Sequence, residues 1–304
     1  MVSSFSTNLF ANLTKGEKMD FITLNNGVKM PILGYGTYQI KPEETQKCVE
    51  EAISVGYRLI DTAQAYFNEE GVGAAINSAL KGGVKREELF ITTKLWITHA
   101  NEKEALKAFE TSLKKLGLEY LDLYLIHQPF NDTYGAWRVM SRLYKEGRIK
   151  AIGVSNFYPD RFTDFALNQE IKPMINQIEC SPFHAQFEAQ NILKEYECVL
   201  QSWASFGEGR NDFFKNELLS KIGSKYGKTN AQVTLRWLIQ RGIVVIPKTT
   251  RKERMKENFA VFDFALDDSD MKAIASLDNK QSLFFNHQDP AMVKWLIEVY
   301  KDKF

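Results

Sequence analysis

"RLIDTAQAYFNEEGVGAAI" (residues 58–76) contains one copy of the pattern that decides the fold: an apolar run that stops at Asp61, followed by a helix-like stretch. The same order recurs along the chain, where short apolar runs alternate with longer amphipathic segments. Each such run predicts a strand. The runs span residues 32–34, 58–61, 89–94, 121–127, 149–154, 174–177, 199–203 and 243–246.

Amphipathic segments between these runs predict helices. In "PEETQKCVEEAISVG" (42–56), one face at helical spacing consists of Thr45, Cys48, Val49, Ala52 and Ile53. Strands that alternate with helices in this way predict an α/β fold, a (β/α)8 TIM barrel of about 250 residues. A doubly wound open sheet is the alternative, but "GYGTYQI" (34–40) departs from the GxGxxG fingerprint of that fold.

The segments near the N-terminus indicate how the chain is organised. Residues 1–18 lack apolar patterning and a secretory signal, so we predict a disordered extension there. Residues 21–31 predict an N-terminal β-hairpin, since Asn26-Gly27 suits a tight primed turn. No Pro/Gly-rich linker interrupts the rest, and we therefore predict a single barrel domain at 19–304.

Composition limits the classes of partner. The chain has 304 residues and a formal net charge of +1, which indicates no nucleic-acid surface. No apolar stretch is long enough to span a membrane. The three cysteines form no CxxC pair, and together with the lack of a secretory signal this predicts a cytoplasmic protein. The histidine spacing predicts no metal, and the absence of an interface stripe predicts a monomer.

Polar side chains end most of the predicted strands. Asp61, Lys94 and His127 stand at three of these ends, and Tyr66 lies five residues beyond Asp61. Other ends carry Ser155, Asn156, Gln177, Trp203 and Lys248. Taken singly, such residues are commonly helix caps, solvated tips or core fillers. Because catalytic groups of a barrel come from the C-terminal ends of several strands, their joint recurrence indicates a shared site.

Four of these side chains form a set suited to carbonyl reduction. A phenol with a pKa of about 10 is a weak acid near neutrality, but a lysine ammonium close by lowers that pKa. We expect Asp61 to hold the Lys94 ammonium beside the Tyr66 hydroxyl. A neutral His127 could donate a hydrogen bond to a carbonyl oxygen. Such a group protonates an oxygen that gains negative charge while a hydride reaches the carbon.

A basic segment follows the last predicted strand. "PKTTRKERMK" (247–256) contains five cations and two hydroxyls, at the place where barrels commonly bind phosphate. Arginine and lysine both suit phosphate, although a solvated face of a surface helix is the alternative interpretation. The segment favours NADPH, with its additional phosphate, over NADH.

Two long segments carry a family resemblance. "GYRLIDTAQAYFNEEGVGAAI" (56–76) and "IPKTTRKERMKENF" (246–259) are similar to signature segments of the aldo-keto reductases, which are NADPH-dependent barrel reductases. The resemblance implies a catalytic tetrad of Asp61, Tyr66, Lys94 and His127. It also implies NADPH/NADP+ contacts from Gly36, Thr37, Ser155, Asn156, Gln177, Trp203, Phe206, Lys248, Thr249, Arg254, Glu257 and Asn258.

Several positions depart from the family's usual pattern. Trp203 stands in place of a stacking tyrosine, as in the bacterial and plant-like, diketogluconate-reductase-like branch. Gln128 and Tyr38 stand where many members have tryptophan, and "SFGEGRND" (205–212) replaces the usual Ser-Pro-Leu-Gly. Residues 279–296 correspond to the C-terminal substrate loop. The predicted substrate pocket consists of Tyr38, Trp96, Gln128 and Phe130.

These observations favour one function and leave two alternatives. The favoured one is NADPH-dependent reduction of small-molecule aldehydes and ketones, with Tyr66 as general acid. A non-catalytic NADPH-binding regulatory or structural protein of the same fold would not need the complete tetrad. Double-bond reduction, as in the family's steroid 5β-reductases, expects glutamate in place of His127.

Overall fold

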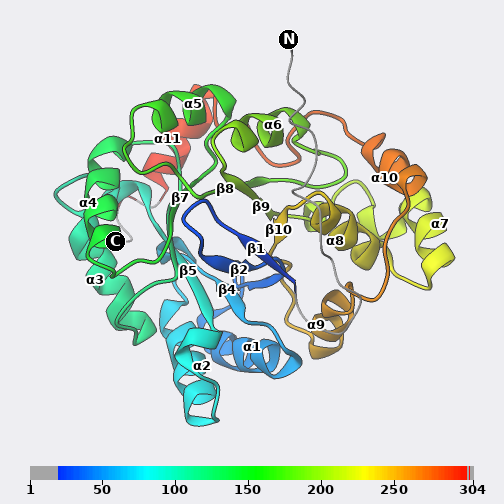
Figure 1. The fold of residues 1–304 in the computed structure, drawn as a ribbon, viewed down its shortest axis with the longest axis horizontal. Helices are drawn as coiled ribbons and strands as arrows, with labels where there is room; N and C mark the ends of the chain where they lie inside the picture. The colour runs from blue at the N-terminus through cyan, green and yellow to red at the C-terminus, as the bar shows by residue number, and fades with distance from the viewer. Residues whose placement is uncertain (1–19, 300, 302–304) are drawn as a thin grey trace.

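Eight parallel strands surround the centre of the molecule, and helices cover them on the outside (Figure 1). The computed structural model describes residues 20–299 and residue 301. Neighbouring strands follow one another in chain order. They are β3 (Gly34–Gly36), β4 (Leu59–Asp61), β5 (Phe90–Leu95), β6 (Leu123–Ile126), β7 (Ile152–Ser155), β8 (Ile175–Glu179), β9 (Val199–Trp203) and β10 (Val244–Val245). All eight predicted strands are confirmed, although the first lies two residues later than predicted.

The barrel is closed between β3 and β10. Leu33 forms a parallel bridge with Val245, and the Gly36 amide donates to the Pro247 carbonyl at 3.2 Å. A Cβ atom on Gly36 would lie 2.7 Å from the Ile246 carbonyl oxygen, so the two segments approach too closely for any other residue. This closure confirms the TIM barrel and excludes the open sheet.

The predicted hairpin is also present. Strands β1 (Phe21–Thr23) and β2 (Lys29–Pro31) pair antiparallel. The Asn26 side-chain amide donates to the Lys150 carbonyl at 2.9 Å, just before β7 begins. The hairpin therefore lies against the N-terminal ends of the barrel strands, and in Figure 1 it crosses the middle of the barrel.

The turn of this hairpin differs from the prediction. A tight primed turn needs a left-handed backbone at both central residues, but only Gly27 has it, with φ +85°, and Asn26 does not. Leu24 and Val28 close the loop through a 2.9 Å hydrogen bond. The loop thus contains three residues and ends on glycine, a geometry that relieves Asn26 of the strained conformation.

Helices follow the strands around the outside of the barrel. The first, α1 (Pro42–Val55), buries the predicted face of Thr45, Cys48, Val49, Ala52 and Ile53. The others are α2 (Glu69–Lys81), α3 (Ala105–Leu116), α4 (Thr133–Lys145), α5 (Pro159–Leu167), α6 (Phe187–Glu195), α7 (Glu217–Tyr226), α8 (Asn230–Gln240), α9 (Lys252–Phe259), α10 (Asp268–Ala275) and α11 (Pro290–Glu298). In the described part of the chain, no helix has both the length and the apolar character needed to cross a membrane.

The core contains one cation among its largest fully buried side chains. Trp137, Trp237, Tyr124 and Phe109 are of the kind expected there, but Lys94 is buried to the same degree. A buried charge is costly unless it is paired and hydrogen-bonded. Its surroundings therefore locate the candidate site. The predicted disordered extension at residues 1–18 lies outside the described residues, and the domain boundary at Met19 stays a prediction.

Candidate active site

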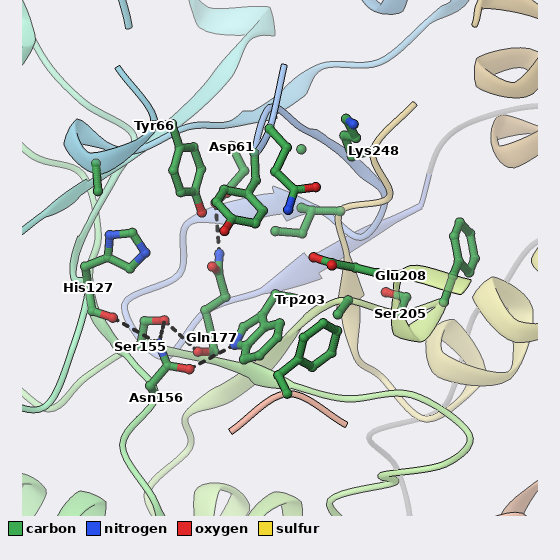
Figure 2. A pocket seen from close by; sticks show the side chains of 18 of the residues that line it. Asp61, Tyr66, His127, Ser155, Asn156, Gln177, Trp203, Ser205, Glu208 and Lys248 are labelled. Atoms are coloured by element: carbon green, nitrogen blue, oxygen red, sulfur yellow. Dashed lines mark hydrogen bonds between the residues drawn. The ribbon is translucent and has the colours of Figure 1, made fainter. Parts of the chain in front are cut away.

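The four predicted catalytic side chains meet at the C-terminal end of the barrel. Asp61 ends β4, Lys94 lies in β5, and Tyr66 ends the short 3-10 turn η1 (Gln64–Tyr66). His127 directly follows β6 and contacts the Tyr66 ring edge-on, with ring centroids 5.7 Å apart. Figure 2 shows the Tyr66 hydroxyl and the His127 ring on the same side of the cavity.

The Lys94 ammonium is held by three oxygen atoms. Its Nζ donates to Asp61 Oδ1 at 2.5 Å, to the Thr62 carbonyl at 2.9 Å and to the Tyr66 hydroxyl at 3.1 Å. Burial lowers the pKa of Lys94 and raises that of Asp61, while the attraction between the two charges opposes both shifts. Three acceptors around one cation favour its charged form. The geometry places that charge in direct contact with the phenol.

His127 is neutral at neutral pH. Burial first, then the nearby Lys94 ammonium and the His287 imidazole, lower its pKa well below the ordinary value. Trp96 packs edge-on against the imidazole, with ring centroids 5.0 Å apart. Nδ1 has no hydrogen-bond partner among the described residues. The ring thus faces the cavity as an uncharged group that can donate a single hydrogen bond.

A chain of hydrogen bonds links the tetrad to the next three strand ends (Figure 2). Gln177 Nε2 donates to Asp61 Oδ2 at 2.8 Å, and Ser155 Oγ donates to the Gln177 carbonyl at 2.8 Å. The Asn156 amide donates to Ser155 Oγ at 3.1 Å, and Trp203 Nε1 donates to Asn156 Oδ1 at 2.9 Å. These bonds fix the orientation of each side chain before any ligand binds.

The strand ends open into a cavity of about 570 Å³, a size within the usual range for small-molecule sites. Most of the predicted site residues contribute to its wall. They are Gly36, Tyr38, Asp61, Tyr66, Trp96, His127, Gln128, Ser155, Asn156, Gln177, Trp203, Phe206 and Lys248.

Other predicted residues lie behind or beside this wall. Thr37 Oγ1 donates to the Asp61 carbonyl, and the buried Lys94 contacts the cavity wall through Asp61 and Tyr66. Phe130, predicted in the substrate pocket, is not among the residues that line the cavity. It packs against the cluster of Ala65, Trp96, Ile97 and Leu296, and its ring stacks on His287 with centroids 6.2 Å apart. The remainder belong to the basic segment: Thr249, Arg254, Glu257 and Asn258.

The basic segment begins at the cavity and continues into α9. Lys248 lines the wall, and the Arg254 guanidinium lies 6.0 Å from the ring of Phe214, which lines it as well. Glu257 accepts a hydrogen bond from Thr229, and Asn258 is buried. The cavity thus offers a half-buried indole, polar side chains at three strand ends and cations at the rim. This set of groups fits a dinucleotide with phosphate groups.

Part of the wall comes from residues that the strand-end pattern missed. Phe284, Phe285, Trp295 and Leu296 enter from the C-terminal segment, and Glu208 and Arg210 from the loop at 205–212. The Arg210 guanidinium donates to the Leu283 carbonyl and lies 4.1 Å above the Phe284 ring. Because these contacts join segments about seventy residues apart, no local sequence pattern predicts them.

His287 gives this site a measurable pH dependence. Burial lowers its pKa to about 4, so between about pH 6.5 and pH 4 the unfolded chain binds a proton that the folded protein does not. The free energy of unfolding therefore contains a contribution that is lost as the pH falls through this window. We expect it to fall by about 1–2 kcal/mol more in the wild type than in His287→Gln between pH 7 and pH 5. Urea denaturation at both pH values measures the difference. An equal fall in the free energy of unfolding in the two proteins would contradict the burial of a neutral imidazole.

Comparisons with known proteins agree with this geometry. A model of the "Aldo/keto reductase family" matches residues 32–279. An uncharacterised oxidoreductase of Bacillus subtilis, YtbE, is 47% identical over 84% of this chain and 92% of its own. The glyoxal reductase of the same bacterium is 44% identical over 86% and 94%. The crystal structure of a Bombyx mori aldo-keto reductase in complex with NADP matches with a TM-score of 0.85 and 34% identity, covering 94% of this chain and 97% of that one.

Proposed function

The chain belongs to the aldo/keto reductase family, and on that premise we propose that it reduces aldehydes and ketones to alcohols with NADPH. One observation carries the proposal: Lys94 Nζ donates both to the Asp61 carboxylate and to the Tyr66 hydroxyl at the wall of a cavity. This is the arrangement that makes a phenol able to donate a proton near neutrality.

Each member of the tetrad has a separate task in this proposal. Tyr66 donates its proton to the carbonyl oxygen as negative charge develops there. Lys94 stabilises the phenolate that remains, and Asp61 keeps the ammonium charged and oriented. His127 donates a hydrogen bond that fixes the position of the carbonyl oxygen. NADPH, when bound, supplies the hydride.

The side chains that would hold the cofactor follow from the same wall. The half-buried Trp203 ring offers a flat surface for the nicotinamide, next to the polar groups of Ser155, Asn156 and Gln177. Lys248, Thr249 and Arg254 would bind the 2′-phosphate, and Glu257 and Asn258 would contact the adenine. Gly36, Thr37 and Phe206 complete the set. The cofactor-bound silkworm relative supports NADP(H) as the cofactor.

Cofactor choice gives a test of the basic segment. Arg254→Ala should weaken NADPH binding about tenfold to a hundredfold, because a charge-assisted bond to the 2′-phosphate is lost. NADH, which lacks that phosphate, should bind equally well to both proteins. Quenching of tryptophan fluorescence measures both dissociation constants.

Arg251→Ala is the matched control for this change. It removes the same charge from the same segment, three residues earlier, at the N-cap of α9, where the side chain makes no capping hydrogen bond. An equal loss of NADPH affinity in both variants would indicate a diffuse electrostatic effect and would contradict a specific contact by Arg254.

The proposed reaction is tested by mixing the protein with NADPH and a reactive aldehyde and following the loss of NADPH absorbance. Steady, enzyme-dependent oxidation of NADPH with formation of the alcohol is the expected result. The alternative, a non-catalytic NADPH-binding protein, predicts quenching of fluorescence by NADPH without turnover. Absence of turnover with a broad set of aldehydes and ketones would refute the proposal.

A further inference from the structure

A buried histidine contacts the cavity wall from the C-terminal segment. His287 lies in the connection between α10 and α11 yet is only 6% exposed. Its Nε2 lies 2.8 Å from Oε1 of Gln128, the residue that follows His127 and lines the cavity. None of the tasks assigned to the tetrad uses this pair.

A third residue determines which nitrogen of His287 carries the proton. The Tyr158 hydroxyl, at the start of α5, lies 3.3 Å from His287 Nδ1 and accepts a hydrogen bond from the His287 backbone amide at 3.3 Å. A neutral imidazole has one donor and one acceptor nitrogen. Gln128 Oε1 can only accept, so Nε2 carries the hydrogen and donates to it, and Nδ1 accepts from the Tyr158 hydroxyl.

This direction determines which end of the Gln128 amide faces the cavity. Its oxygen is occupied by His287, whereas its NH2 group has no hydrogen-bond acceptor among the described residues. Gln128 is 6% exposed, and that exposure is to the cavity. The wall beside His127 therefore presents two hydrogen-bond donors next to each other.

We propose that His287 is a positioning residue, which turns the Gln128 amide so that its NH2 binds a second oxygen of the substrate beside the reacting carbonyl. The preferred substrates are then carbonyl compounds with an oxygen on the adjacent carbon. The inference rests on the proposed carbonyl reduction. Tyr158 and His287 act through Gln128, which alone would touch the substrate.

Two aldehydes of equal length separate this role from general catalysis. Methylglyoxal has the second oxygen and propanal lacks it. In Gln128→Met and His287→Phe, kcat/KM for methylglyoxal should fall about threefold to tenfold, mainly through KM, while propanal changes less than about twofold. Tyr158→Phe, which removes one hydroxyl and leaves the His287 packing intact, should shift the same ratio in the same direction by about twofold to threefold. A steric role for His287 predicts no change in Tyr158→Phe.

Gln39→Met is the matched control, because Gln39 lines another part of the cavity and the side-chain change is identical. Its substrate ratio should equal that of the wild type. If the wild type reduces propanal, and Gln128→Met and Tyr158→Phe both keep its ratio of kcat/KM for methylglyoxal to kcat/KM for propanal, the positioning role alone is overturned. A wild type that reduces neither aldehyde nor any other carbonyl would overturn the proposed function, and this inference with it.

Discussion

Tyr66→Phe should lower kcat for aldehyde reduction by about 10²–10⁴-fold while leaving NADPH binding unchanged. The substitution removes the only group placed to protonate the substrate oxygen in the proposed mechanism. The ring itself stays, with its contacts to Tyr38 at 5.0 Å and to His127 at 5.7 Å, so the wall of the cavity should keep its shape. Steady-state kinetics and fluorescence quenching by NADPH measure the two effects separately.

Tyr144→Phe is the control for this variant. It deletes the same hydroxyl, but at the hairpin on the opposite end of the barrel, where Tyr144 accepts a hydrogen bond from Asn26. Its turnover should match the wild type. Near-normal turnover in Tyr66→Phe would show that another group protonates the substrate.

Lys94→Met should abolish turnover and also lower the free energy of unfolding by about 3–5 kcal/mol. The reason is that Asp61, only 1% exposed, would lose its cationic partner and remain as a buried carboxylate. Urea denaturation of the wild type and the variant measures the loss. A change below about 1 kcal/mol, the value typical of exposed ion pairs, would contradict a desolvated pair.

A double variant separates the structural role of this pair from its chemical role. Lys94→Met combined with Asp61→Asn removes both charges. The double variant should therefore regain much of the unfolding free energy that is lost in Lys94→Met. Turnover should not return, because the phenol then has no cation beside it. If the double variant were as active as the wild type, the ion pair would be structural only.

The sequence was sufficient to predict the barrel, and most of the candidate site residues that it indicated line one cavity. Strands β5 and β6 are buried on both faces, so Lys94 within β5 and His127 directly after β6 stand out as exceptions. Barrel geometry then brings all strand ends to one rim. For that reason the sequence alone places Asp61 and Gln177, 116 residues apart, at one rim, where a hydrogen bond joins them in the structure.

Other features depend on contacts that no local pattern contains. Residues 32–36 are all apolar or glycine, so the hydrophobic pattern did not determine where β3 begins. The start of β3 is determined by its pairing with β4 and by the bridge between Leu33 and Val245 of β10. The turn at Asn26 was assigned from a dipeptide preference that the three-residue loop overrides. Phe130 was predicted in the substrate pocket for its aromatic character, but it is not among the residues that line the cavity and its ring stacks on His287 of the C-terminal segment.

The central claim is that the Lys94 ammonium makes the Tyr66 phenol acidic. It is tested most directly by titrating the phenolate absorbance of the wild type against that of Tyr66→Phe, so that other tyrosines cancel. The account predicts that the phenolate of Tyr66 forms below the ordinary pKa of about 10 and that Lys94→Met moves this titration upward. A difference spectrum that appears only above about pH 10, and does not move in Lys94→Met, would contradict it.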